Sequence, residues 1–224
     1  MAYILAFEGI DGTGKGTQAQ ILHDRLTALG SRCLMLSFPD YDSFIGRDVG
    51  VLLSGRNSVT AATLDAKSMA LWFAAERFRT FNAADRSGCD YVILNRYVMS
   101  NAVYQSMRVE PQERDAFTKW LLHLEHTEFG LPHPDTYFIF DVHEELSAAN
   151  VARKGHRGYT GDNPDVYEAS PQIQTAVRRA YRDIARHTRS RCEFITCMNK
   201  DGSMRPAHEI ADEVFAKLPE GHSS

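Results

Sequence analysis

A glycine-rich segment with one lysine carries the clearest chemical signal in the sequence. It follows a short apolar run and leads into a stretch with the apolar spacing of a helix. Glycines let backbone N–H groups turn toward an anion, while a helix N-terminus and a lysine add positive charge. The segment therefore predicts a phosphate loop for a nucleoside triphosphate. Its members are Gly9, Ile10, Asp11, Gly12, Thr13, Gly14, Lys15, Gly16 and Thr17.

The loop alone does not separate a kinase from a GTPase or a motor protein. GTPases read guanine with Asn-Lys-x-Asp after a late strand, and here residues 199–202 have the aspartate one position early. Their turn-rich composition indicates a surface turn. The modest length and a charged, glycine-containing segment at 154–171 point instead to a nucleoside monophosphate kinase, which must exclude water while a phosphoryl group moves.

The elements that would hold such a loop follow from the apolar pattern. Short apolar runs alternate with helical stretches, which is typical of an α/β fold with a parallel sheet covered by helices on both faces. We expect one domain over 1–218, with a lid at about 153–169 and a frayed tail at 219–224. The predicted strands are 3–7, 33–38, 91–94, 137–142 and 193–196, and the predicted helices are 15–29, 45–53, 60–86, 100–107, 111–126, 144–153, 172–189 and 207–218.

Composition narrows the class of protein. The 224 residues contain 25 Lys and Arg against 29 Asp and Glu, a formal net charge of −4, which argues against a dedicated nucleic-acid binder. No apolar run approaches the roughly 18 residues of a membrane span, and no signal peptide is predicted. The 4 cysteines lack metal-ligand spacing, so we expect free thiols in the cytoplasm.

Several motifs occur together in an order that is far more specific than any one of them. They are the segments 7–17, 38–41, 71–77, 95–105, 130–135 and 165–168. In that order and spacing the sequence resembles the thymidylate kinase family of P-loop nucleoside monophosphate kinases, over nearly its whole length. The resemblance implies the P-loop NTPase fold, ATP and dTMP as substrates, Mg²⁺ with the ATP, and a homodimer built on helices 45–53 and 60–86.

The resemblance also implies how the thymine and sugar are bound. Phe73 would stack on the base, and Arg77, one helical turn later, would donate to a thymine carbonyl. Asn101 would contact the amide edge of the base, with Ser100, Gln105 and Tyr167 close by. Tyr104 would lie beneath the sugar and disfavour a 2′-hydroxyl. Without the resemblance, the same residues read as a core phenylalanine, a solvated arginine, a helix cap and a core tyrosine.

The phosphate side of the acceptor follows in the same way. Arg96 would grip the 5′-phosphate, because a guanidinium matches phosphate geometry. Tyr41 would hydrogen-bond to that phosphate, and Phe38 with Pro39 would shape the wall of the pocket. Asp11 would accept from the sugar 3′-hydroxyl and help organise the metal; a plain turn aspartate is the alternative for this residue.

For catalysis, the family uses a cation from the phosphate loop or from the lid. Gly12 carries no charge, so we expect Arg157 or Arg153 in the lid to neutralise the transferring phosphoryl group, together with Lys15 and Arg96. Arg153 lying over adenine is the other role open to it. Asp11 and Glu168 are the predicted metal-side residues, partly through water.

The sequence departs from the family pattern at two metal-side positions. Asn95 stands where the family usually has aspartate, and Gly16 stands where a hydroxyl usually meets the magnesium ion; Thr17, next along, contacts a phosphate instead in this interpretation. Two other functions remain open at this point. One is a different nucleoside monophosphate or deoxynucleoside kinase, and the other is a nucleotide-binding switch protein without turnover.

Overall fold

The computed structural model describes residues 2–143, 146, 147, 150 and 171–219. Five strands form one parallel sheet in the order β2-β3-β1-β4-β5. This confirms the predicted five-stranded parallel sheet. The strands are β1 (Tyr3–Glu8), β2 (Cys33–Ser37), β3 (Tyr91–Asn95), β4 (Thr136–Asp141) and β5 (Arg191–Thr196).

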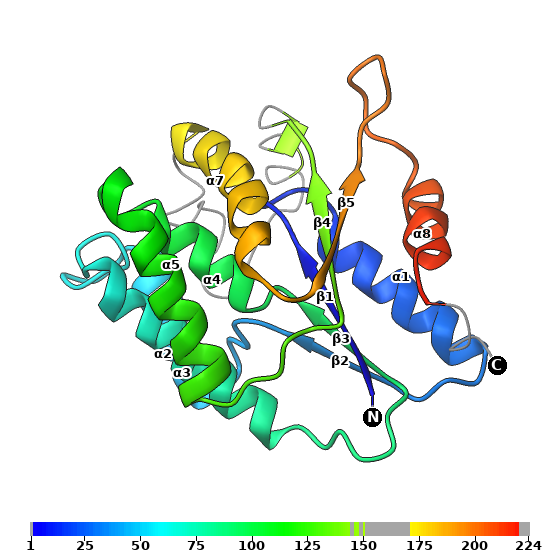
Figure 1. Ribbon diagram of the computed structural model, residues 1–224, viewed down its shortest axis with the longest axis horizontal. Helices are drawn as coiled ribbons and strands as arrows, with labels where there is room; N and C mark the ends of the chain where they lie inside the picture. The colour runs from blue at the N-terminus through cyan, green and yellow to red at the C-terminus, as the bar shows by residue number, and fades with distance from the viewer. Residues whose placement is uncertain (1, 144–145, 148–149, 151–170, 220–224) are drawn as a thin grey trace.

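Each central strand sends alternate side chains to two separate cores, because successive residues of a strand point to opposite faces. In β1, Ala6 packs in one core, whereas Leu5 and Phe7 pack in the other. Helices cover both faces (Figure 1). One face holds α1 (Lys15–Ala28) and α8 (Ala207–Ala216), and the other holds α2 (Phe44–Ser54), α3 (Ala66–Ala83), α4 (Val98–Ser106), α5 (Arg114–His123) and α7 (Pro171–Ile184).

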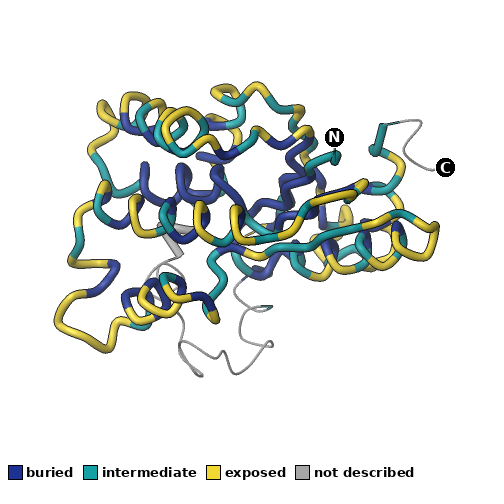
Figure 2. The backbone as a smooth tube through the Cα atoms, turned by 90° about the horizontal axis from the view of Figure 1, so that it is seen from below, coloured by how far each residue is buried: buried dark blue, intermediate teal, exposed yellow. Residues whose placement is uncertain are grey.

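Burial follows this layering. Figure 2 shows the inner segments of the chain as buried, whereas the outer turns of the helices are exposed. The two cores contain the apolar residues of the central strands, such as Ile93 and Leu94, at 0% exposure. A strand that is buried on both faces needs a nearly continuous apolar run, and the sequence of β3 provides one. No helix in the described part of the chain is both long and apolar enough to cross a membrane.

The predicted helix over 60–86 is wrong at both ends. Its α-helical part is α3 alone, which begins after Asp65, whose side chain accepts from the Ser68 backbone N–H at 2.9 Å. Thr60 and Thr63 form a separate turn through a Thr60 N–H to Thr63 Oγ1 bond of 2.9 Å. At the other end Ala84 is extended. At the N-terminal end, good helix formers were overridden by local capping groups, which compete with the helix for backbone partners.

The remaining differences are smaller. The predicted helix over 111–126 is helical in three successive forms, a 3-10 turn η1 (Pro111–Glu113), then α5, then a π-helical segment η2 (Leu124–Glu128). The predicted helix over 172–189 divides into α7 and a 3-10 turn η3 (Ala185–His187). Most of the predicted helix over 144–153 and the whole predicted lid from 153 to 169 lie outside the described residues.

The strand order creates a crevice at one edge of the sheet. From β1 the chain moves first to β2 and β3 on one side and later to β4 and β5 on the other. In open α/β sheets, ligands bind where the order reverses, outside the carboxyl ends of the strands. The end of β1 and the loop after it, together with the end of β3, therefore mark the place to look for a site.

Candidate active site

The glycine-rich segment forms a tight turn between β1 and α1. Gly9 has a positive φ of 139°, and a side chain there would approach the Phe140 carbonyl oxygen to 2.6 Å. Gly12 has a positive φ of 80°, and a side chain there would collide with the backbone of Ser147. Glycine alone suits both positions. The strand–loop–helix context that a phosphate loop requires is thus present.

The cation of the loop is held at the start of α1. Lys15 is the first residue of this helix and is 7% exposed. Its Nζ donates to the Ile10 carbonyl at 3.1 Å and lies 3.4 Å from Asp11 Oδ1. Thr13 Oγ1 donates to the same Ile10 carbonyl at 3.0 Å, whereas Thr17 is exposed in the first turn of α1. The ammonium group is therefore fixed at the mouth of the loop.

Arg96 follows β3 and points toward this loop. Its guanidinium bonds Asp11 through Nη2 and Ser100 Oγ through Nη1, the latter at 3.2 Å. Its backbone φ is 63°, the only positive φ of a non-glycine residue in the described part of the chain. Such a conformation costs about 1–3 kcal/mol and persists where the surroundings enforce it, often at functional sites. A hydrogen bond from Arg96 N to the Phe7 carbonyl, at 2.9 Å, helps to enforce it.

Glu8, at the end of β1, organises the residues around Arg96. Its carboxylate accepts from the backbone N–H groups of Tyr97 at 2.8 Å and Ser100 at 3.2 Å, from Ser100 Oγ, and from Tyr181 Oη at 3.1 Å. Burial raises the pKa of Glu8, although the bonds from Ser100 and Tyr97 and the charge of Arg96 act in the opposite direction. We did not predict Glu8 from the sequence. The signal was a carboxylate directly after a buried apolar strand.

A pocket opens between α2, α3 and α4 beside the loop. Arg96 and Asp11 line it, and so do Phe73 and Asn101. The structure thus brings together every described residue that was predicted to bind dTMP. The pocket is lined by Asp11, Phe38, Pro39, Tyr41, Leu53, Phe73, Arg77, Arg96, Ser100, Asn101, Tyr104 and Gln105.

The part of the pocket lined by Arg77 and Asn101 is held by buried polar groups. Arg77 Nε lies 2.6 Å from Oε2 of Glu125, in an ion pair whose side chains are 3% and 0% exposed. Asn101 Nδ2 donates to Glu125 Oε1 at 2.9 Å. Asn101 Oδ1 is buried and has no partner among the described residues. Glu125 comes from the π-helical segment η2 and was missed in the sequence analysis; the signal was an acid at a buried helical position, four residues after Leu121.

Tyr104 and Gln105 occupy the side of the pocket formed by α4. Tyr104 Oη lies 3.3 Å from Asp11 Oδ2, and the guanidinium of Arg96 lies 5.4 Å from the centre of the Tyr104 ring. Burial holds the pKa of Tyr104 well above its usual value, so this hydroxyl is protonated. Gln105 is fully buried, and its Oε1 accepts from Arg108 Nη1 at 2.9 Å.

The Phe38–Pro39 peptide bond is cis, and both residues line the pocket. Glu76 supports this segment from α3: its Oε1 accepts from the Asp40 backbone N–H at 3.0 Å and from Thr80 Oγ1 at 2.8 Å. Burial raises the pKa of Glu76. The acid was inside a recognised motif, yet no positioning role was predicted for it.

The two metal-side positions, Asn95 and Gly16, carry no charged side chain. Asn95 Oδ1 is buried without a partner among the described residues, and Asn95 Nδ2 donates to Ser37 Oγ at 3.3 Å. A side chain at Gly16 would lie 3.6 Å from Asn95 Nδ2. Asp11 already bonds Arg96 and Lys15. The described residues contain no group of three or more His, Cys, Asp or Glu that could hold a metal ion.

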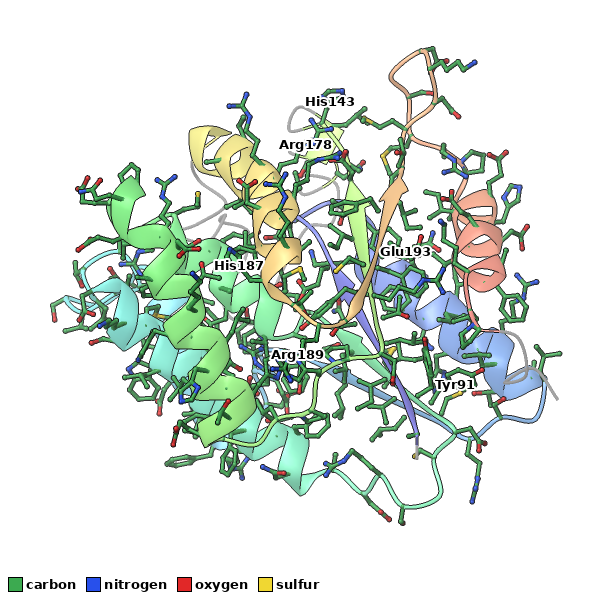
Figure 3. All side chains as sticks on the ribbon, in the orientation of Figure 1. Tyr91, His143, Arg178, His187, Arg189 and Glu193 are labelled. Atoms are coloured by element: carbon green, nitrogen blue, oxygen red, sulfur yellow. The ribbon has the colours of Figure 1, made fainter. Side chains whose placement is uncertain are left out.

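Helix α7 is attached to the carboxyl end of β4. Asp141 accepts from Arg178 through both oxygens and from Arg182 Nη2 at 3.0 Å. Burial raises the pKa of Asp141, but the bond and charge of Arg178 outweigh it and hold the pKa below its usual value. Figure 3 shows Arg178 beside His143, and their side chains lie 3.1 Å apart. The helix that follows the predicted lid is thus fixed to the sheet.

Two comparisons identify the family. A family model described as thymidylate kinase matches residues 7–201. A thymidylate kinase of Mycobacterium tuberculosis is 31% identical over 186 residues, covering 81% of this chain and 85% of the relative. The chain belongs to the thymidylate kinase family. A thymidylate kinase of Caenorhabditis elegans is similar over more of the chain, at 28% identity over 227 residues that cover 96% of this chain and 90% of the relative.

Solved structures share the fold. The structure of thymidylate kinase from Candida albicans superposes with a TM-score of 0.69 at 21% identity, covering 96% of this chain and 90% of that chain. The one from Ehrlichia chaffeensis gives 0.64 at 22% identity, covering 97% and 99%. As a member of the thymidylate kinase family, the chain is a nucleotide-binding phosphotransferase with the P-loop NTPase fold. This decides against a switch protein without turnover.

Four of the predicted site residues are not among those that the structure describes. They belong to the predicted lid, which lies outside the described residues, so their roles stay predictions. They are Arg153, Arg157, Tyr167 and Glu168.

Proposed function

We propose that the protein transfers the γ-phosphoryl group of ATP to dTMP, giving ADP and dTDP. One observation carries the proposal: a single pocket is lined both by the aromatic ring of Phe73 and by the guanidinium of Arg96, and Arg96 shares the Asp11 carboxylate with Lys15 of the loop. A nucleoside monophosphate lying in it would direct its phosphate toward the loop. The transfer is then an attack by one acceptor phosphate oxygen on the γ-phosphorus of ATP, with ADP as the leaving group.

The site supports this transfer by positioning and charge. The loop over residues 9–17 cradles the ATP phosphates, and Lys15 neutralises part of their charge. Arg96 holds the acceptor phosphate through its guanidinium, with Tyr41 as a second donor. The acceptor is already an anion at neutral pH, so no strong general base is required. Holding both anions in line provides most of the rate enhancement.

The sugar is positioned by the contact between Tyr104 and Asp11. With Tyr104 Oη 3.3 Å from Asp11 Oδ2, the 3′-hydroxyl meets a carboxylate acceptor while the tyrosine ring occupies the space beneath the 2′ carbon. A ribose 2′-hydroxyl would meet that ring and lose its water without a partner. The arrangement favours a deoxyribonucleotide. Phe73 provides the stacking surface for the base.

Magnesium enters with ATP, and the described residues fit a loosely held ion. When bound, Mg²⁺ neutralises charge on the ATP phosphates. Asn95 Oδ1 is a buried oxygen without a partner at the edge of the loop, so it suits a hydrogen bond from a metal-bound water. Asp11 shares its charge with two cations, which limits it to a contact through water. Glu168 is the proposed acid from the lid.

Because Gly12 supplies no cation, we assign the remaining positive charge to the lid, to Arg157 or Arg153. Both lie near the start of the predicted lid within a single domain over 1–218. Closing that segment over the loop would add charge where it develops and exclude water. Separate Arg157→Met and Arg153→Met variants distinguish the two: the catalytic arginine should lower kcat, whereas one that lies over adenine should chiefly raise the KM for ATP.

The protein is proposed to act as a homodimer through α2 and α3. Val51, Val59 and Trp72 line one groove there and are 45%, 51% and 36% exposed. Trp72→Glu should yield monomers in sedimentation velocity at concentrations where the unchanged chain is dimeric. Phe194→Glu is the matched control, because Phe194 is also 36% exposed but lies on β5.

The free thiols of the described cysteines suit the reducing cytoplasm, where we propose that the dimer works.

The direct test is a kinase assay on the purified chain with Mg²⁺ and ATP. ADP formation should depend on added dTMP, and dTDP should appear in equal amount. AMP and UMP serve as competing acceptors. Lys15→Met should remove the activity. Equal ADP formation with and without dTMP, or a preference for AMP or UMP, would contradict the proposed function.

A further inference from the structure

Glu125 is a fully buried carboxylate that no substrate atom needs to touch. It lies in the π-helical segment η2, behind the end of the pocket where the base is proposed to bind, and its side chain is 0% exposed. Its two oxygens bond two different residues that line the pocket, Arg77 and Asn101. A buried acid in this place must therefore be judged by what it does to those two side chains.

The first effect concerns the orientation of the Asn101 amide. Its nitrogen donates to the Ala70 carbonyl at 3.0 Å and to Glu125 Oε1 at 2.9 Å. Both partners are pure acceptors, so only the NH₂ group can face them. The amide oxygen is thereby turned the other way. It is buried and has no partner among the described residues, although Asn101 lines the pocket.

The second effect concerns Arg77. Glu125 accepts from its Nε at 2.6 Å and from its Nη2 at 3.3 Å, which fixes the plane of the guanidinium. Nη1 is the nitrogen that Glu125 does not hold. Arg77 Nη2 and Asn101 Nδ2 share the same oxygen, Oε1, so the two side chains are locked relative to each other. Toward the pocket they present an arginine donor beside an amide acceptor.

We propose that Glu125 is a specificity-determining positioning residue that makes the pocket reject cytosine. It does so by fixing Asn101 with its oxygen toward the base, next to the Arg77 donor. The inference rests on the proposed function, since it concerns the base of the acceptor nucleotide. Glu125 itself touches neither base nor phosphate and acts only through its two partners.

The chemistry of the bases explains the choice. Thymine and uracil offer an N3–H donor next to an O4 acceptor, which complements an amide oxygen beside an arginine. Cytosine offers the reverse, an N3 acceptor next to an N4 amino donor. In a site with a fixed pattern, cytosine would leave two buried groups unpaired, and such mismatches are rejected strongly. If the Asn101 amide could turn over, its nitrogen would accommodate cytosine N3.

The isosteric substitution Glu125→Gln tests this directly. An amide at position 125 brings its own N–H₂ against the donors of Arg77 or Asn101, and one relief is for the Asn101 amide to turn over. We expect the ratio of kcat/KM for dTMP over dCMP to fall at least tenfold, through a higher KM for dTMP and improved use of dCMP. Glu128→Gln is the matched control, since Glu128 belongs to η2 but its side chain is 61% exposed.

A role of Glu125 in folding alone would lower activity toward dTMP and dCMP by the same factor. An unchanged ratio, or an equal loss for both nucleotides, therefore overturns the proposal. Equilibrium binding of dTMP and dCMP to the same variants gives the ratio independently of turnover. If the unchanged chain binds dTMP but does not phosphorylate it, the proposed function fails, while the binding ratio still judges Glu125.

Removing a charge from a buried pair can prevent folding, so a measurement on the unchanged chain accompanies the variant. Both Asn101 amide protons should exchange with water far more slowly than those of Asn57, which is exposed. The Asn101 resonances are assigned by their loss in Asn101→Ser. Slow exchange of both protons supports the locked amide. Exchange of either proton as fast as in Asn57 would contradict it.

Discussion

The two arginines of the pocket each bond a carboxylate, yet their surroundings differ. Arg77 and Glu125 are sealed, with side chains 3% and 0% exposed. Arg96 and Asp11 are open to water at 18% and 22%, and Asp11 also lies near Lys15 and Tyr104. In the sealed pair, the charge of Arg77 is neutralised by a carboxylate that water does not reach. In the proposed function, Arg96 of the open pair exchanges its carboxylate for the acceptor phosphate.

This difference assigns two kinds of work to the same residue type. A cation whose charge is permanently neutralised by a buried acid contributes a hydrogen-bond pattern, which suits an uncharged base. A cation that reaches water retains attraction for an incoming dianion, which suits a phosphate. The following predictions test the contrast, beginning with the largest expected effect.

Removing the sealed cation should destabilise the fold most. Arg77→Met leaves Glu125 buried without its ion-pair partner, a change that costs about 3–5 kcal/mol. Arg96→Met should cost about 1 kcal/mol or less, because Asp11 reaches water and keeps Lys15 nearby. Urea denaturation of both variants measures the two free energies of unfolding. Equal losses would mean that the two pairs are not different in kind.

Removing the open cation should lower catalytic activity strongly, although it costs little stability. Arg96→Met removes donors from the acceptor phosphate, and loss of one such group typically lowers kcat about 10²–10³-fold. Arg47→Met is a suitable control, because Arg47 is exposed on α2 and its side chain donates only to the Asp42 carbonyl, at 2.9 Å, among its described contacts. Steady-state kinetics with dTMP gives both values. A loss below tenfold in Arg96→Met would exclude it as the phosphate grip.

His126, which follows Glu125 in η2, should make the fold sensitive to acid. Burial lowers the pKa of His126 to about 4, and its ring stacks on His133 at 3.8 Å between centroids. The unfolded value is about 6.5, so between these pH values the unfolded chain binds a proton that the folded chain excludes. Stability from this group is complete above pH 6.5 and is lost as pH falls toward 4.

The loss should approach about 2–3 kcal/mol across that pH range. His126→Gln should flatten this part of the profile of unfolding free energy against pH. His123→Gln is the control, since the His123 side chain is 60% exposed one turn earlier. Parallel profiles for the unchanged chain and His126→Gln would show that His126 is not responsible.

The smallest effect is expected at the metal-side edge. Asn95→Asp places a carboxylate beside the loop. The Mg²⁺ concentration that gives half-maximal activity should therefore fall a few-fold, while kcat changes less. Ser37→Ala removes the partner of Asn95 Nδ2 without adding charge and serves as control. A magnesium titration of activity at fixed ATP gives the half-saturating Mg²⁺ concentration and kcat for each variant. If neither activity nor metal dependence changes, the Asn95 side chain does not tune the metal.

The sheet and loop were predictable because their signals are local. The central strands are short apolar runs, and the glycines at positions 9 and 12 satisfy backbone conformations that few other residues adopt. The predicted helix over 60–86 failed at its N-terminal end because Asp65 caps a helix that begins only at Ala66. Helix propensity does not include that competition between side chain and backbone.

The sequence predicted the residues that line the pocket but not the acids that position them, for a related reason. The motifs named the residues that line the pocket, such as Arg77 and Arg96, because these lie within recognisable segments. The acids behind them were missed, because Glu8 and Glu125 acquire their importance from partners far away in the sequence, such as Tyr181 and Arg77. A buried carboxylate can be justified only by its tertiary partners.

The central claim is that one end of the pocket reads the base and the other holds the phosphate. Calorimetric binding of dTMP and of thymidine, to the unchanged chain, Arg96→Met and Asn101→Leu, tests it most directly. Arg96→Met should abolish the advantage of dTMP over thymidine and leave thymidine affinity unchanged, whereas Asn101→Leu should weaken both ligands by the same factor. If Arg96→Met weakens thymidine as much as dTMP, the division between the two ends is wrong.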